Sequence, residues 1–252
     1  EGAAFVFLGS PTGLNPLFDW RYESNTPQEE FGIAVSTAGD VNGDGYDDVL
    51  IGANSPLASS MGKAYVFYGS PTGLTAVPAW VATGEQIADK FGTAVASVGD
   101  VNNDTYDDII IGAPEYNGTS GVPSGRAYVY YGSAAGLSTT ADWIAESDLD
   151  GSRFGISVNS AGDVNNDTFA DVIIGAPDYA PNGVTGLTAV YLGGQNGLPA
   201  ANPPVATLGD ASSVLIGQLP FGAPHQFGFA AAAAGDVNGD GFGDVIVGAP
   251  GH

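Results

Sequence analysis

The segment FGTAVASVGDVNNDTYDDIIIGAP at residues 91–114 occurs in four closely similar copies along this 252-residue chain. The copies occupy residues 31–54, 91–114, 154–177 and 227–250, and their starts are separated by 60, 63 and 73 residues. Each copy combines a Phe-Gly pair, an acidic loop and a continuously apolar run that ends in Gly-Ala. Three elements that recur in the same order indicate one structural module repeated in tandem.

A second unit is repeated between these four acidic cassettes. Its copies are GAAFVFLGSPTGL from Gly2, GKAYVFYGSPTGL from Gly62, GRAYVYYGSAAGL from Gly125 and the looser TGLTAVYLGGQNGL from Thr185. The first three copies are each followed by a tryptophan: Trp20, Trp80 and Trp143. The chain is therefore an alternation of two repeated units over its whole length.

The apolar patterns predict four strands in each repeat. Residues 32–36 are small and roughly alternating, which suits a strand crowded against its neighbours, whereas residues 109–111 are all isoleucine, which suits a strand covered on both faces. The AYVFY-like run supplies a third strand and the Trp-containing segment a fourth. This arrangement and the repeat length predict an all-β fold, a β-propeller of four-stranded antiparallel blades, as a single domain or propeller segment over residues 1–252.

The order of the units predicts a half-blade at each end of the chain. The chain opens with a third and a fourth strand and closes with a first and a second. Because an unpaired sheet edge is a liability, the two halves are expected to pair. They could close a small ring within the chain, or pair with another chain or with further repeats.

The charge excludes some partners. The formal net charge is -23, with five Lys and Arg residues, so nucleic-acid phosphates and anionic membrane surfaces would be repelled. No apolar run is long enough to span a bilayer, so no membrane insertion is expected. The chain begins at Glu1 without Met and without a signal-type segment, which indicates a processed product or a piece of a longer protein. It has no cysteine, so redox chemistry does not indicate its compartment.

The acidic residues are concentrated in the four loops, which hold 14 of the 28 Asp and Glu side chains in a repeated DxNxDxxxD pattern. Calcium prefers six to eight oxygen ligands, and side chains at positions 1, 3 and 5 of a tight loop converge on one point. Position 9 would close the shell. The predicted side-chain ligands are Asp40, Asn42, Asp44 and Asp48; Asp100, Asn102, Asp104 and Asp108; Asp163, Asn165, Asp167 and Asp171; and Asp236, Asn238, Asp240 and Asp244. The backbone carbonyls at position 7 are those of Tyr46, Tyr106, Phe169 and Phe242.

The competing interpretation is that these loops are ordinary solvated turns, since Asp, Asn and Gly favour turns. In ordinary turns, the three carboxylates of each loop would repel one another with no cation to offset the repulsion. The repeated pattern therefore favours bound calcium, about four ions in total. Zinc is disfavoured because Cys is absent, and magnesium suits an irregular cage of protein oxygens less well. At position 6 the β-branched Thr105 and Thr168 resist a positive φ that Gly45 and Gly241 accept, which predicts weaker sites or a different turn in repeats two and three.

These residues resemble the FG-GAP repeat family, which includes the integrin α-subunit propeller and many secreted bacterial proteins. The Phe-Gly pairs, the acidic loops and the Gly-Ala-Pro tripeptides carry the resemblance over essentially the whole chain; repeat one has Asn54 in place of Pro. The spacers are more similar to those of bacterial surface proteins than to animal integrins. The resemblance implies a calcium-binding module for adhesion or protein and ligand interaction, located outside the cell, secreted or at the cell surface.

Three other functions compete with this one. Catalysis has little support, because no nucleophile elbow, phosphate-binding Gly loop or HExxH motif is present, and no catalytic residue is predicted. A carbohydrate-binding module would use Trp20, Trp80 and Trp143 to bind a glycan ligand, but their equivalent positions in the repeat favour a role in blade packing. A structural building block would self-associate through its terminal half-blades.

Overall fold

The computed structural model describes residues 1–55, 60–118, 121–181, 186–199, 206–217 and 225–251, and its architecture is all-β. Three complete blades are four-stranded antiparallel sheets whose strands lie in chain order. The first blade holds β5 (Phe31–Gly39), β6 (Asp48–Ala53), β7 (Lys63–Phe67) and β8 (Trp80–Thr83). The second holds β9 (Ala94–Gly99), β10 (Asp108–Ala113), β11 (Arg126–Tyr130) and β12 (Trp143–Glu146). The third holds β13 (Ser157–Gly162), β14 (Asp171–Ala176), β15 (Leu187–Tyr191) and β16 (Ser213–Ile216), and the short 3₁₀ helix η2 (Leu208–Asp210) precedes β16.

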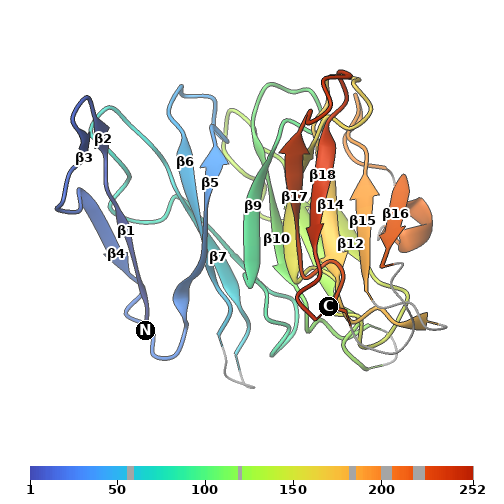
Figure 1. Cartoon of the computed structure of the whole chain (residues 1–252). Helices are drawn as coiled ribbons and strands as arrows, with labels where there is room; N and C mark the ends of the chain where they lie inside the picture. Colours follow the sequence, from blue (N-terminus) through green and yellow to red (C-terminus); the bar gives the residue numbers. More distant parts are fainter. Residues whose placement is uncertain (56–59, 119–120, 182–185, 200–205, 218–224, 252) are drawn as a thin grey trace.

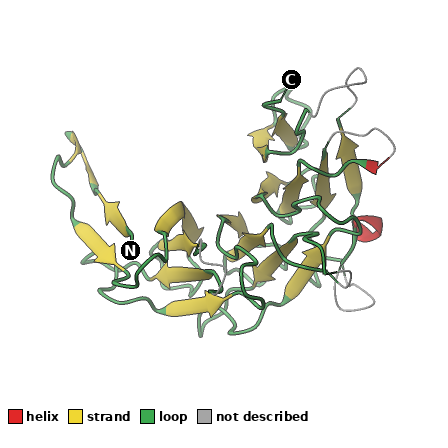
Figure 2. Cartoon of the chain, turned by 90° about the horizontal axis from the view of Figure 1, so that it is seen from below, coloured by secondary structure: helices red, strands yellow, loops and turns green. Residues whose placement is uncertain are grey.

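A half-blade lies at each end, as the sequence predicts. At the N-terminal end, β1 (Ala3–Val6) pairs with β4 (Trp20–Glu23), and the small hairpin β2 (Gly9–Ser10) and β3 (Gly13–Leu14) lies between them in the chain. At the C-terminal end, β17 (Ala230–Gly235) pairs with β18 (Asp244–Gly248). The two half-blades form separate sheets at opposite ends of an open arc of blades (Figures 1 and 2). The architecture is thus that of a β-propeller without closure of the ring within this chain.

The second strand of each complete blade forms the centre of the core. Ile109, Ile110 and Ile111 in β10 are completely buried, and β14 is buried along its whole length. The second strand pairs with the first on one side and the third on the other, and neighbouring blades cover both of its faces. The prediction of a strand covered on both faces is therefore confirmed.

The Phe-Gly and Gly-Ala motifs meet between neighbouring blades. A Cβ atom added to Gly112 would lie 1.9 Å from the carbonyl oxygen of Gly155, in the Phe-Gly pair of the next repeat. Gly155 itself has a φ of +87°, which L side chains rarely adopt. Glycine is therefore needed on both sides of this contact, because the two backbones touch.

The three tryptophans join each outer strand to the next blade. The Trp80 indole N–H donates to the Ser138 carbonyl at 2.7 Å, and its ring packs edge-on against Tyr130 with centroids 4.9 Å apart. Trp20 makes the same contacts with Thr75 and Phe67, and Trp143 makes them with Pro199 and Tyr191. These contacts favour blade packing over an exposed sugar-binding platform.

Candidate functional site

The four acidic loops all connect the first strand of a repeat to its second. In the first repeat, Gly39 pairs with Asp48 at the end of the hairpin, and the same pairing recurs as Gly99 with Asp108. Every hairpin carries a register shift at this point, so the loop leaves the sheet at the same place in each copy. The loops therefore lie at one and the same end of the blades.

Within a loop, the side chains at positions 1, 3 and 5 share one hydrogen-bond network. In the first repeat, the two carboxylate oxygens of Asp40 accept from the backbone N–H groups of Asp44 at 3.0 Å and Gly45 at 2.8 Å. The Asn42 amide oxygen accepts from the same Asp44 N–H at 2.9 Å, and its Nδ2 donates to the Asp44 carboxylate at 3.1 Å. The Asp44 carboxylate in turn accepts from the Tyr46 N–H. The structure thus brings the first three predicted ligands together.

The other three loops repeat this network. The position 1 carboxylates of Asp100, Asp163 and Asp236 each accept from the N–H groups of positions 5 and 6 at 2.8–3.1 Å. The amides of Asn102, Asn165 and Asn238 each donate to the position 5 carboxylate. Four segments far apart in the sequence therefore adopt one loop geometry.

Position 9 is placed differently from the other three side chains. Asp108 is completely buried, and its two carboxylate oxygens accept from the backbone N–H groups of Val101 and Gly132, both at 2.9 Å. Asp48 and Asp171 make the equivalent pair of bonds, whereas Asp244 accepts from Val237. In the three complete blades, position 9 thus holds the loop against the end of the third strand, a role that the sequence analysis missed. The glycine that follows each third strand was the only signal of it.

Burial raises the pKa of two of the position 9 carboxyls, that of Asp48 to about 6 and that of Asp108 to about 8. The two backbone N–H donors act in the opposite direction, because they stabilise the ionised form. The neighbouring carboxylates at positions 1 and 5 raise these pKa values further by repulsion. A carboxylate that is buried beside other carboxylates is thus a destabilised anion unless a cation lies nearby.

The donor set of each loop consists of oxygen atoms. In the described part of the chain, the position 7 carbonyls of Tyr46, Tyr106, Phe169 and Phe242 accept no hydrogen bond from other protein groups. Carboxylate, amide and carbonyl oxygens in this number fit a hard divalent cation. Among the described residues, however, no three Asp, Glu, His or Cys side chains lie close enough together to hold a metal ion. The chemistry of the loop fits a cation, while the convergence of its carboxylates is not formed.

Neighbouring loops are joined to each other at position 8. The Asp107 backbone N–H donates to the Asp40 carbonyl of the preceding repeat at 3.3 Å, and its carboxylate accepts from the Asp40 N–H at 2.8 Å. The backbone N–H groups of Ala170 and Gly243 make the same contact with Asp100 and Asp163. Position 8 therefore tolerates different side chains because its backbone makes the contact.

Thr105 and Thr168 adopt the turn that the sequence analysis expected them to resist. Their φ angles are +76° and +78°, close to +88° at Gly45 and +94° at Gly241. The prediction of a different turn in repeats two and three is therefore wrong: the network around position 1 imposes the same turn. The backbone is therefore strained at Thr105 and Thr168, because β-branched residues disfavour a positive φ.

We expect Thr105→Gly to raise the free energy of unfolding by about 1 kcal/mol, because relief of positive-φ strain exceeds the extra entropy of unfolded glycine. Gly45→Thr provides the matched reverse substitution and should lower it by about 1–2 kcal/mol. Urea denaturation of both variants measures the two changes. Equal effects of the same sign would show that the strain at position 6 is negligible.

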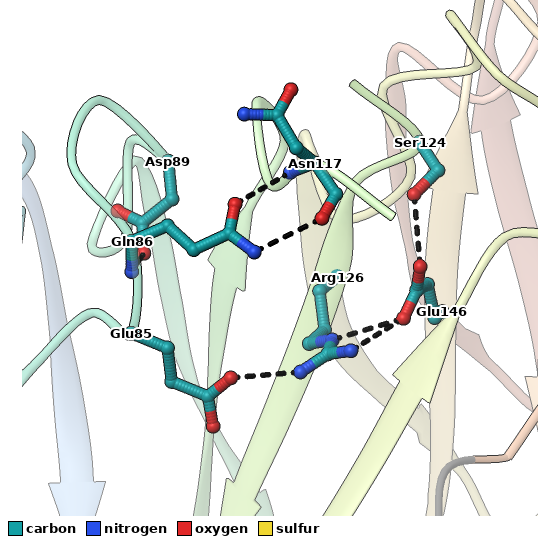
Figure 3. Close-up of polar contacts among 7 residues, drawn as sticks. All are labelled: Glu85, Gln86, Asp89, Asn117, Ser124, Arg126 and Glu146. Carbon is teal, nitrogen blue, oxygen red and sulfur yellow. Dashed lines mark hydrogen bonds and ion pairs between the residues drawn. The ribbon is translucent and has the colours of Figure 1, made fainter. Parts of the chain in front are cut away.

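A second polar cluster lies at the opposite end of the blades, where β10 ends and β11 begins (Figure 3). The Arg126 guanidinium donates to Glu85 at 2.8 Å and to Glu146 at 2.5 Å, and it lies 3.6 Å from the centroid of the Tyr116 ring. Gln86 exchanges two hydrogen bonds with the Asn117 backbone, both at 3.0 Å. Because Glu85 follows the first blade and Arg126 belongs to the second, the cluster joins neighbouring blades.

Comparison with known proteins agrees with this geometry. The FG-GAP repeat model matches residues 31–67, 91–130, 154–192 and 227–252, which together make up more than half of the chain. Mouse integrin alpha-IIb is 37% identical over 58% of this chain and 15% of its own length. Integrin alpha pat-2 of Caenorhabditis briggsae is 30% identical over 97% of this chain and 21% of its own length. Integrin alpha-PS2 of Drosophila melanogaster is 32% identical over 93% of this chain and 16% of its own length.

The chain thus spans about one fifth or less of the length of these relatives. Within the described residues, no helix has the length and apolar character needed to cross a membrane. The matched ranges cover each acidic loop together with the strands on either side of it, so the shared unit is the repeat itself. The chain belongs to the FG-GAP repeat family, and its relatives include integrin α subunits.

Proposed function

We propose that this chain is an extracellular, calcium-binding propeller module for adhesion or ligand interaction, secreted or at the cell surface. The observation that carries the proposal is the recurrence of one Asp-Asn-Asp hydrogen-bond network in four loops at the same end of the blades. The integrin α relatives support a role in interaction and not in catalysis. The net charge of -23 favours cationic ligands and disfavours nucleic acid.

Positions 1, 3, 5 and 9 of each loop, with the carbonyl of position 7, would hold one calcium ion. Calcium, when bound, would supply the positive charge that the carboxylates of the loop lack. In the first loop, formation of the site requires Asp48 to turn toward Asp40 and Asp44 while its hydrogen bonds to Val41 and Gly69 are kept or exchanged. The loop residues therefore both fix the turn and supply the ligands.

Calcium should contribute a large part of the stability. With a dissociation constant of ~0.1 mM and calcium at ~1 mM, linkage gives about 1.4 kcal/mol for each site and about 5–6 kcal/mol for four independent sites. At about 2–4 °C per kcal/mol, the melting temperature should fall by roughly 10–20 °C on chelation. Isothermal titration and thermal melts in calcium and in chelator measure both quantities.

The control variants are Asp40→Ala, Asp100→Ala, Asp163→Ala and Asp236→Ala, each of which should remove about one bound ion. Absence of calcium binding, with melts unchanged by chelator, would leave the loops as turns only. Magnesium in place of calcium tests ion selectivity, and we expect weaker binding because magnesium demands octahedral geometry.

The terminal half-blades favour self-association as a second candidate function. Phe5 and Phe7 at one end and Ile246 at the other are between 45% and 63% exposed, whereas their counterparts in the complete blades are buried. Either further repeats of a longer chain or a second copy of this chain can complete these sheets. A molar mass that rises with concentration would support assembly between copies, and a constant monomer mass would exclude it.

A further inference from the structure

A pocket of about 430 Å³ lies between the N-terminal half-blade and the first complete blade, beside the first acidic loop. Its apolar walls include Val6, Leu8, Trp20 and Leu74, and Asp19 and Asp47 lie at its polar side. The pocket is one of three grooves formed where the third strand of one sheet faces the loop after the third strand of the next. Comparison of the three grooves indicates which kind of side chain would fill the pocket.

In the other two grooves, a tyrosine fills the space. Tyr68 occupies the groove between the first and second blades, and a Cβ atom added to Gly136 would lie 1.9 Å from its hydroxyl. Tyr131 occupies the groove between the second and third blades, where a Cβ atom on Gly197 would lie 2.3 Å from its hydroxyl. At the equivalent Gly73, a Cβ atom would meet nothing within 4 Å.

The difference follows from one residue of the repeat. Alignment of GAAFVFLGSPTGL with GKAYVFYGSPTGL and GRAYVYYGSAAGL places Leu8 at the position of Tyr68 and Tyr131. Leucine is shorter than tyrosine, and Leu8 remains 50% exposed. The loop opposite is otherwise the same, because the Ser70 hydroxyl donates to the Gly73 carbonyl at 2.6 Å just as Ser133 does to Gly136. The pocket therefore lies where a tyrosine side chain fills each of the two equivalent grooves.

A hydrogen-bond donor for a hydroxyl group is also in place. In the groove between the second and third blades, the backbone N–H of Leu198 donates to the Tyr131 hydroxyl at 3.1 Å. The corresponding donor in the pocket is the Leu74 N–H, and none of the described protein groups accepts a hydrogen bond from it. A ligand hydroxyl at this position would satisfy the Leu74 N–H as the Tyr131 hydroxyl satisfies that of Leu198.

We propose that this pocket binds a phenol group, the side chain of a tyrosine in a partner protein or peptide, flanked by basic residues. The ring would lie against Trp20 and Leu74, and its hydroxyl would accept from the Leu74 N–H. Asp19 and Asp47 favour positive charge on either side of the tyrosine. The assignment deepens the proposed ligand-interaction function, on which it rests, by naming the group that is recognised.

The test uses the peptide acetyl-Arg-Tyr-Arg-amide and its Phe and Glu-Tyr-Glu analogues, titrated into the isotopically labelled whole chain in calcium. We expect the amide signal of Leu74 and the indole signal of Trp20 to shift with the Tyr peptide. The Phe analogue should bind at least about fivefold more weakly, because it lacks the hydroxyl. The Glu-flanked peptide should also bind more weakly, and the difference should shrink in high salt.

Leu8→Tyr fills the pocket from within the chain and should weaken peptide binding at least about tenfold, with the fold retained, since two repeats already carry tyrosine there. Leu192→Tyr makes the same substitution at the equivalent position of the third blade and should leave binding unchanged. Equal binding of the Phe peptide, or undiminished binding to Leu8→Tyr, would overturn the assignment. Calcium binding without peptide binding would overturn only the assignment of the pocket to a tyrosine side chain. Absence of calcium binding would overturn the proposed metal role, whatever the result for the peptide.

Discussion

Replacement of Trp80 by alanine is expected to lower the free energy of unfolding by about 3–5 kcal/mol, because it removes a large buried aromatic ring. Trp80 is 7% exposed, packs edge-on against Tyr130 and donates to the Ser138 carbonyl of the next blade. The substitution therefore leaves a cavity at the contact between two blades as well as an unpaired carbonyl. Urea denaturation followed by circular dichroism measures the loss.

Trp20→Ala is the matched control for this prediction. Trp20 makes the same type of contacts, with Phe67 and Thr75, but it belongs to the half-blade and remains partly exposed. Its replacement should cost clearly less, about 1–2 kcal/mol, because less of the ring is removed from water on folding. Equal losses at both positions would contradict the view that the stability comes from burial between complete blades.

Asp108→Ala is expected to lower the free energy of unfolding by about 2–4 kcal/mol in the presence of chelator. The substitution leaves the buried N–H groups of Val101 and Gly132 without an acceptor, and each unpaired buried donor costs about 1–3 kcal/mol. Measurement in chelator separates this structural role from any loss of calcium binding. A loss seen only in calcium would mean that Asp108 acts as a ligand alone.

Asp244→Ala provides the control at the same position of the fourth loop. Asp244 accepts from the Val237 N–H, and Val237 is 72% exposed, so water can replace the lost acceptor. We expect a change below about 1 kcal/mol in chelator. The comparison of Asp108 with Asp244 therefore distinguishes a buried carboxylate that accepts two backbone hydrogen bonds from an exposed carboxylate at the same position of the motif.

The fold could be predicted in detail because its signals are local and repeated. The isoleucines at residues 109–111 require a strand covered on both faces, and only stacked blades provide such cover for every repeat. The sequence also placed positions 1, 3 and 5 in one tight loop, where they form a hydrogen-bond network within six residues of one chain segment. Local geometry of this kind is encoded by residue type and spacing.

Two other features could not be predicted in this way. Thr105 follows the turn of Gly45 because the position 1 carboxylate holds the loop in that turn, which residue propensity alone does not reveal. Asp108 reaches the N–H of Gly132, 24 residues away, only after the third strand has paired with the second. The Asp108 contact depends on strand order and on burial, which are properties of the assembled sheet.

The sequence by itself determined the repeated unit, the strand order, the half-blades and the acidic loops, because each follows from a short and periodic pattern of side chains. The tertiary structure alone decided that the arc stays open, that the position 9 carboxylate holds the loop against the end of the third strand and that the space between Leu8 and Gly73 is left unfilled. The physical reason is that the last two features arise between segments about 20 to 70 residues apart and the first between the two ends of the chain, where packing and desolvation outweigh local preference.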